Sequence, residues 1–212
     1  MLSLVIETCT ERAIVAFVED GHCLFMAGLP YGFHNSRFLV PKIDEGFECI
    51  KKQPQDLDFI VAGVGPGSYT GIRVGATVAK TMSYSCKVPL VGISTLECFL
   101  PDCDGSFAAI LDAKMAGAHF LKGDCKGDLI TYTSLPEICK LEELTEKLSD
   151  VTTLVCPHGP ALRKKIEEVC PDAKWSWLET GPDPIRMSQL GKEKLDRGEY
   201  TQDGSLELLY MR

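Results

Sequence analysis

Short runs of apolar and β-branched residues follow one another through the first half of the chain. They cover residues 2–7, 13–18, 22–28, 58–64 and 89–93. Runs of this length between polar turns are typical of buried strands. Asp20-Gly21 stands between the second and third runs, and this dipeptide is a hairpin signal. We therefore predict that the first three strands form an antiparallel meander.

Helical spacing appears between these strands. After the third run, apolar residues recur at Leu39, Ile43, Phe47 and Ile50. This spacing predicts an amphipathic helix over residues 35–52, which Pro41 is expected to kink. A second helix is predicted over residues 70–85, directly after a glycine-rich turn. A capping box of the form Ser-x-x-Glu, from Ser94 to Glu97, predicts a short third helix.

The same order of elements is predicted a second time, after a linker at residues 100–106. Strands are expected at 107–111, 117–122, 129–133, 153–156 and 173–178, and helices at 141–148, 160–170 and 188–197. The order strand-strand-strand-helix-strand-helix-strand thus occurs twice, and such a repeat carries fold information. It predicts an α/β protein with the actin-like ATPase fold (the sugar kinase, Hsp70 and actin type, ribonuclease H-like). Two lobes, 1–99 and a reduced 107–212, would each hold a mixed sheet with flanking helices.

Composition restricts the class of protein. Of the 212 residues, 45% are hydrophobic and 25% charged, which is ordinary for a soluble globular chain. The formal net charge is -8. A protein that binds nucleic acid without a partner protein is expected to have a basic surface. No apolar run reaches the roughly 18 residues needed to span a membrane, and no basic segment precedes the first strand. We expect a cytoplasmic protein with no membrane contact.

Ten cysteines are present, but no Cys-x-x-Cys pair. The nearest two, Cys98 and Cys103, fit no common zinc spacing. Several cysteines lie in apolar runs: Cys9, Cys23, Cys49 and Cys156. We expect small, buried, reduced side chains there.

The glycine-rich segment after the fourth strand reads Gly65-Pro66-Gly67-Ser68-Tyr69-Thr70-Gly71-Ile72-Arg73-Val74-Gly75. It lacks the lysine of a phosphate-binding P-loop, and Thr70 stands where a dinucleotide fingerprint needs its third glycine. Small residues instead recur every four positions, at Gly67, Gly71, Gly75, Ala79 and Ser83. On a helix they form one stripe that lets another backbone approach closely. The stripe can face this protein's own sheet or a helix of a partner, and the sequence leaves both open.

Catalytic signals are scarce. No two of the four histidines, His22, His34, His119 and His158, lie within four positions of each other, so no metal pair on one helix can form. Ser68 lies on a strand-to-helix turn, but its surroundings do not match Gly-x-Ser-x-Gly, and we expect it to cap the helix. Glu7 and Asp112 begin equivalent parts of the repeat. With Thr8, Thr10 and Ser68 they are the candidates for a residual nucleotide or anion site, and the alternative for Glu7 is a carboxylate that satisfies turn amides.

Residues 65–75 closely resemble the signature of the bacterial TsaB proteins, also called YeaZ, which are inactive relatives of the TsaD (Gcp) proteins. Further segments resemble this family in order: Ile6-Glu7-Thr8-Cys9-Thr10, His34 with Leu39 and Pro41, Val91 to Glu97, Leu111 to Met115, and Leu209 to Arg212. The N-terminal half is covered well and the C-terminal half thinly. Glu7 departs from the aspartate of the family motif, and its carboxylate would lie about 1.5 Å further out.

The resemblance implies a non-catalytic subunit. It would pair with a TsaD-like protein, and then with a TsaE-like ATPase, to make threonylcarbamoyladenosine beside the anticodon of tRNA, which it would contact through the complex rather than directly. Alone it would form a homodimer through much the same helices. The partner-binding residues implied are His34, Leu39, Ile43, Gly67, Tyr69, Thr70, Gly71, Arg73, Val74, Gly75, Val78 and Met82.

Two consequences of the resemblance can be checked. No catalytic residue, metal or cofactor is expected, and ATP or ADP would bind only weakly or at the partner interface. An arginine at Gly71 or Gly75 should block association while the monomer stays folded. The competing hypotheses are a nucleotide-binding ATPase and a metal-independent hydrolase or glycoprotease-like enzyme.

Overall fold

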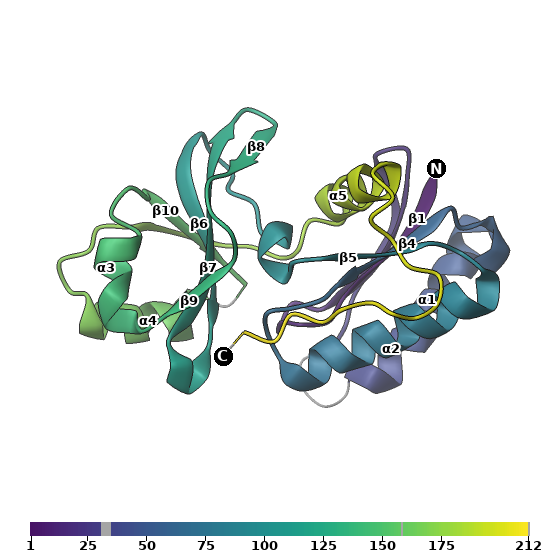
Figure 1. Ribbon diagram of the computed structural model, residues 1–212, viewed down its shortest axis with the longest axis horizontal. Helices are drawn as coiled ribbons and strands as arrows, with labels where there is room; N and C mark the ends of the chain where they lie inside the picture. The colour runs from purple at the N-terminus through teal and green to yellow at the C-terminus, as the bar shows by residue number, and fades with distance from the viewer. Residues whose placement is uncertain (31–34, 158, 212) are drawn as a thin grey trace. The chain divides into compact units, whose positions relative to one another are not determined.

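The computed structural model describes residues 1–30, 35–157 and 159–211. The chain divides into two compact units (Figure 1). The first combines Met1–Cys98 with Pro182–Leu209, and the second is formed by Phe99–Gly181 and the residues from Tyr210 onward. This division differs from the expected lobes, 1–99 and 107–212, because residues 182–209 return to the first unit.

The sheet of the first unit contains the predicted meander. Its strands are β1 (Leu2–Glu7), β2 (Ile14–Glu19), β3 (His22–Gly28), β4 (Phe59–Gly63) and β5 (Leu90–Ile93), in the order β3-β2-β1-β4-β5. β1, β2 and β3 pair antiparallel, whereas β4 and β5 run parallel to β1. Asp20 and Gly21 both have positive φ, 48° and 80°, as a two-residue hairpin turn requires. The hairpin prediction is confirmed.

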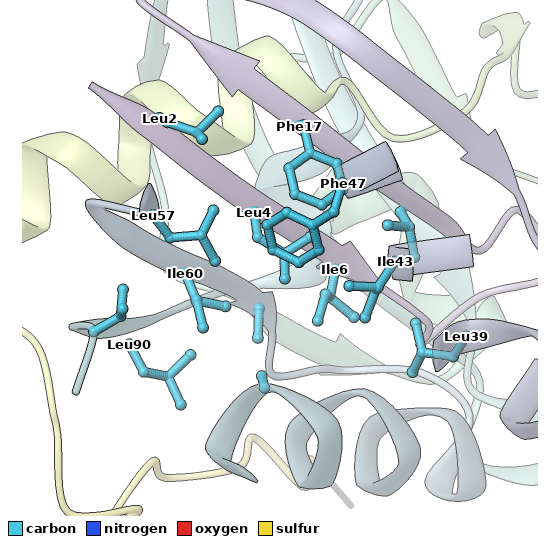
Figure 2. Close-up of a cluster of buried hydrophobic side chains, with 14 of the residues drawn as sticks. Leu2, Leu4, Ile6, Phe17, Leu39, Ile43, Phe47, Leu57, Ile60 and Leu90 are labelled. Carbon is cyan, nitrogen blue, oxygen red and sulfur yellow. The ribbon is translucent and has the colours of Figure 1, made fainter. Parts of the chain in front are cut away.

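Two helices cover one face of this sheet and a third covers the other. α1 (Asn35–Ile50) and α2 (Tyr69–Cys86) lie on one side, and α5 (Pro184–Asp196) lies on the opposite side (Figure 1). In Figure 2, Leu39, Ile43 and Phe47 of α1 point toward the side chains of β1 and β2. Phe17 and Phe47 meet edge to face with ring centroids 4.7 Å apart. Full burial of a side chain such as Phe17 stabilises the fold by about 1.5–3 kcal/mol.

The C-terminal segment completes the first unit. Asp183 caps α5 by accepting hydrogen bonds from the amides of Ile185 and Arg186. The segment after α5 then forms a bridge to β5 at Leu90 and Thr201, and Leu206 packs against the hydrophobic core. It therefore covers the edge of the sheet that β5 would otherwise leave open.

The second unit repeats the strand order of the first. It contains β6 (Gly105–Asp112), β7 (Ala118–Lys126), β8 (Leu129–Tyr132), β10 (Thr153–Cys156) and β11 (Ser176–Glu179), in the order β11-β10-β6-β7-β8. Here too the first three strands pair antiparallel and the last two run parallel to the first. From α3 (Leu144–Lys147) and α4 (Gly159–Val169), the side chains of Leu144, Leu162 and Ile166 join the hydrophobic core of this unit. The predicted repeat and fold class are confirmed.

Several boundaries differ from the predictions. β9 (Glu137–Cys139) was not predicted, since three residues are too few to show a period, and it pairs with β7. The helix expected at 141–148 is a 3-10 turn, Leu141–Glu143, followed by the single turn of α3. The short third helix is also a 3-10 turn, Thr95–Cys98, although the Ser94 amide donates to Glu97 Oε2 at 2.9 Å as in a capping box. α5 begins at Pro184 rather than at 188, because Asp183-Pro184 is itself a helix start.

Candidate functional site

The glycine-rich turn joins β4 to α2 and packs against the turn that follows β1. Its Gly65-Pro66 peptide bond is cis. Gly67 has φ 151°, and a Cβ there would lie 2.3 Å from the carbonyl oxygen of Cys9. That carbonyl accepts a hydrogen bond from the Ser68 amide at 2.7 Å. Ser68 Oγ in turn accepts from the Gly71 amide at 3.2 Å, so Ser68 caps α2 as predicted.

The stripe of small residues faces this protein's own sheet. A Cβ at Gly71 would lie 2.0 Å from the Thr8 carbonyl oxygen, and one at Gly75 would lie 2.3 Å from Thr8 Oγ1. Thr8 Oγ1 also donates a hydrogen bond to the Gly71 carbonyl at 2.7 Å. Ala79 and Ser83 are buried further along the helix. Of the two alternatives that the sequence left open, the structure therefore supports contact with the chain's own first strand.

Four of the residues that the resemblance assigned to a partner surface are enclosed in the first unit. Leu39 and Ile43 are 0% and 4% exposed, and Gly71 and Gly75 are buried. The structure gives a reason against the expectation that an arginine at Gly71 or Gly75 leaves the monomer folded, because even a Cβ at either position would overlap Thr8. Val74, Val78 and Met82 are half-buried and pack against the same core. His34 lies outside the described residues.

The outer side of α1 and α2 exposes a second set of side chains. Tyr69, Thr70 and Arg73 are exposed as expected, and the Arg73 guanidinium stacks 3.9 Å above the centre of the Tyr69 ring. Three exposed apolar residues were not singled out from the sequence: Phe38, Val40 and Tyr84, which are 42%, 56% and 73% exposed. The sequence could have indicated their exposure, because each lies next to a core-facing residue in its helix and therefore points away from the core. We call Phe38, Val40, Tyr69, Arg73 and Tyr84 the outer helix set.

Glu7 lies at the end of β1 in a closed pocket and is 0% exposed. Its Oε1 accepts a hydrogen bond from the Cys9 amide at 2.5 Å, and its Oε2 accepts from Thr95 Oγ1 at 3.1 Å. Burial raises the pKa of this carboxyl, while the Cys9 amide and the neighbouring hydroxyl and thiols act in the opposite direction. The alternative in which Glu7 satisfies a turn amide is what the structure shows.

The other candidates for an anion site have partners within their own units. The Thr8 hydroxyl donates its hydrogen bond to the Gly71 carbonyl in α2. Thr10 Oγ1 accepts a hydrogen bond from the Arg12 amide at 3.3 Å. Asp112 belongs to the second unit, where its carboxylate meets the ammonium groups of Lys165 and Lys114 at 2.7 and 3.4 Å. Burial alone would raise the pKa of Asp112, but the two lysines and the Lys114 amide bring it below its usual value.

The cysteines differ in burial according to the element on which each lies. All ten cysteines are free. Cys9 and Cys156 are buried as expected, whereas Cys23 and Cys49 are exposed, because the first lies on the edge strand β3 and the second on the outer side of α1. Burial lowers the pKa of His119, while the nearby Asp112 carboxylate acts to raise it.

Neither a metal site nor a membrane-spanning helix is found within residues 1–30, 35–157 and 159–211. In these ranges no group of three histidine, cysteine or acidic side chains could hold a metal ion. No helix in them is long and apolar enough to cross a membrane.

A solved structure with the same fold is YeaZ from Pseudomonas aeruginosa. It matches with a TM-score of 0.84 over 99% of both chains, at 16% sequence identity. The match shows that this chain has the actin-like fold, in agreement with the paired sheets described above.

Comparison with known sequences identifies the family. The family model described as "TsaD: tRNA N6-adenosine threonylcarbamoyltransferase" matches residues 33–175. The TsaB protein of Bacillus subtilis is 34% identical over 151 residues, which are 66% of this chain and 65% of that protein. The TsaB protein of Haemophilus influenzae is 32% identical over 123 residues, 55% of this chain and 51% of that protein. The matched segments thus span about two thirds and one half of these relatives. The chain belongs to the family that the TsaD model describes and, within it, to the TsaB (YeaZ) proteins.

Proposed function

We propose that this protein is a non-catalytic subunit in the biosynthesis of threonylcarbamoyladenosine in tRNA. Its partner would be a TsaD-like protein that performs the threonylcarbamoyl transfer, and a TsaE-like ATPase would join the complex. The curated relatives that it matches carry the name tRNA threonylcarbamoyladenosine biosynthesis protein TsaB. With a net charge of -8, this subunit would meet tRNA through the complex.

The observation that carries this proposal is the outer helix set. Aromatic and apolar side chains that remain exposed on helices are typical of protein-binding surfaces, and α1 and α2 carry four of them: Phe38, Val40, Tyr69 and Tyr84. Tyr84 is 73% exposed near the end of α2, and Tyr69 is 51% exposed at its start. The Arg73–Tyr69 stack adds an arginine with a fixed orientation, and tyrosine and arginine are the residue types most often found at binding hot spots. We place the partner contact on this side of α1 and α2.

The surface can be tested by substitution of Tyr84. We expect Tyr84→Ala to weaken binding to the TsaD-like protein about 30-fold, which corresponds to about 2 kcal/mol for a hot-spot aromatic. Its side chain is 73% exposed, so thermal stability should stay near that of the wild type. Calorimetry with the purified partner measures the affinity, and sedimentation of the isolated chain shows whether a homodimer uses the same surface.

A matched control comes from the second unit. Leu129, at the start of β8, is 66% exposed, and Leu129→Ala should leave partner affinity unchanged. Equal affinity of the wild type, Tyr84→Ala and Phe38→Ala for the partner would rule out this surface.

Two other functions remain as alternatives to test. A nucleotide-binding ATPase predicts micromolar affinity of the isolated chain for ATP, which calorimetry can measure directly. A hydrolase predicts a nucleophile beside a base. The enclosed Glu7 and the lysine-paired Asp112 support the subunit proposal over the first alternative, because both carboxylates already have partners within the chain.

A further inference from the structure

The carboxyl group of Glu7 occupies a pocket that three separate parts of the first unit build around it. The turn after β1 supplies the Cys9 amide, 2.5 Å from Oε1. The 3-10 turn Thr95–Cys98 supplies the Thr95 hydroxyl and the Cys98 thiol, whose Sγ lies 3.8 Å from Oε2. These donors are all uncharged. Among the described residues, no lysine, arginine or histidine pairs with Glu7.

The third part of the pocket is Gly63, at the end of β4. A Cβ at Gly63 would lie 1.8 Å from Glu7 Oε2 and 2.7 Å from Cδ. Any larger residue would therefore overlap the carboxyl group. The carboxyl group of Glu7 therefore occupies the space that a side chain at Gly63 would take. Because Glu7 is 0% exposed, the pocket is closed to solvent, and the carboxyl group leaves no room in it for a second group.

The pocket also connects to the start of α2. Cys9, whose amide binds Glu7, accepts the Ser68 amide through its carbonyl at 2.7 Å. Its neighbour Thr8 binds the Gly71 carbonyl through Oγ1. The carboxyl group of Glu7 therefore holds the turn against which the first turn of α2 packs.

We propose that this is a carboxyl-binding pocket whose resident occupant is the chain's own Glu7, and that removal of this side chain creates a site for a small monocarboxylate. The substitution Glu7→Ala keeps Cβ and removes one methylene and the carboxyl group. Acetate contains the same number of carbon and oxygen atoms as the part removed, so it fits the space and restores the acceptors for Cys9 and Thr95. Propionate is one methylene too large, and chloride lacks the two acceptor atoms.

Thermal unfolding of Glu7→Ala in sodium acetate and in sodium chloride at equal ionic strength tests the proposal. We expect a lower Tm than the wild type in chloride. At an acetate concentration tenfold above its Kd, the Tm should rise by about 3–6 °C. Propionate should act more weakly, and the wild type should respond equally to acetate and chloride. An identical response of Glu7→Ala to acetate and chloride would overturn the proposal.

A second variant covers the case in which Glu7→Ala fails to fold in chloride. Gly63→Ala alone should destabilise the protein, because its methyl group competes with Glu7 Oε2 for the same space. In the double variant this methyl group partly fills the vacated pocket, so the loss of Tm should be smaller than the sum of the two single losses. The double variant should also lose the response to acetate. Additive losses, or a Gly63→Ala protein as stable as the wild type, would contradict a full pocket.

Discussion

At the scale of single residues, the most unusual group is the carboxyl of Glu7. A fully buried carboxylate with no cationic partner is costly unless hydrogen bonds compensate for the lost water. One amide and one hydroxyl lie within hydrogen-bond distance of its oxygens, and a thiol lies slightly further away. The position of Glu7 at the end of the first strand could be predicted from the sequence. Its enclosure could not, because Gly63, Thr95 and Cys98 lie far away along the chain.

The raised pKa of Glu7 predicts a specific pH dependence of stability. Because its pKa in the folded protein lies above the reference value of 4.5, the folded state binds the proton more tightly than the unfolded chain. The contribution of Glu7 to the free energy of unfolding is therefore fully present below that reference value and is lost as pH rises through the folded pKa. A tenfold difference in proton affinity between the two states corresponds to about 1.4 kcal/mol in the free energy of unfolding.

Urea denaturation of the wild type and of Glu7→Gln between about pH 4 and about pH 8 measures this effect. The glutamine does not titrate and has nearly the same size. The free energy of unfolding of the wild type minus that of the variant should fall as pH rises. A difference that stays constant or increases with pH would show that Glu7 has no raised pKa.

At the scale of elements, α2 is defined by the small residues that bring it close to β1. Each glycine inside a helix costs about 1 kcal/mol relative to alanine. Here Gly71 and Gly75 offset that cost by allowing contact with the turn at Thr8, including the hydrogen bond from Thr8 Oγ1 to the Gly71 carbonyl. The stripe itself was visible in the sequence, but the surface that it faces was not.

Substitution of Gly71 by alanine measures how tight this contact is. The added Cβ would lie 2.0 Å from the backbone oxygen of Thr8, which cannot move without shifting β1. Gly71→Ala should therefore lower the free energy of unfolding by about 1–3 kcal/mol, despite the better helix propensity of alanine. Thr77→Ala, on the exposed side of the same helix, should be neutral or slightly stabilising in the same urea titration. Equal stability of Gly71→Ala and wild type would show that α2 can move away from β1 at little cost.

At the scale of the whole molecule, the first unit is closed by a segment that is remote in sequence. α5 packs on β1, β2 and β4 through residues such as Gly191, where a Cβ would lie 2.3 Å from Val61 Cγ2. The segment beyond it reaches Val64, whose carbonyl accepts the Leu209 amide at 2.8 Å. The first unit therefore combines residues 1–98 with residues 182–209, the purple-to-teal and yellow segments in Figure 1.

The contribution of this segment can be measured at Leu206. Its side chain packs against the core, and a Cβ at Gly92 would lie 2.8 Å from Leu206 Cδ1. Because Leu206 is only partly buried, Leu206→Ala should lower the free energy of unfolding by about 2 kcal/mol, at the lower limit for buried leucines. The neighbouring exposed Glu207 provides the control, since Glu207→Ala should change stability little. A loss at Leu206 no larger than at Glu207 would mean that the segment contributes no core packing.

The amino-acid sequence alone was enough to predict the order of the longer strands and helices, the repeat, the cap at Ser68 and the family. Each of these rests on local spacing or on a continuous motif such as residues 65–75, and local patterns survive without knowledge of the fold. The three-dimensional structure was needed to show which side of α2 is exposed, what surrounds Glu7 and which unit α5 joins. These depend on contacts such as Thr8 with Gly71 and Ser3 with Ser188. The partners in each pair are far apart in the chain, and they come together only when the sheet forms.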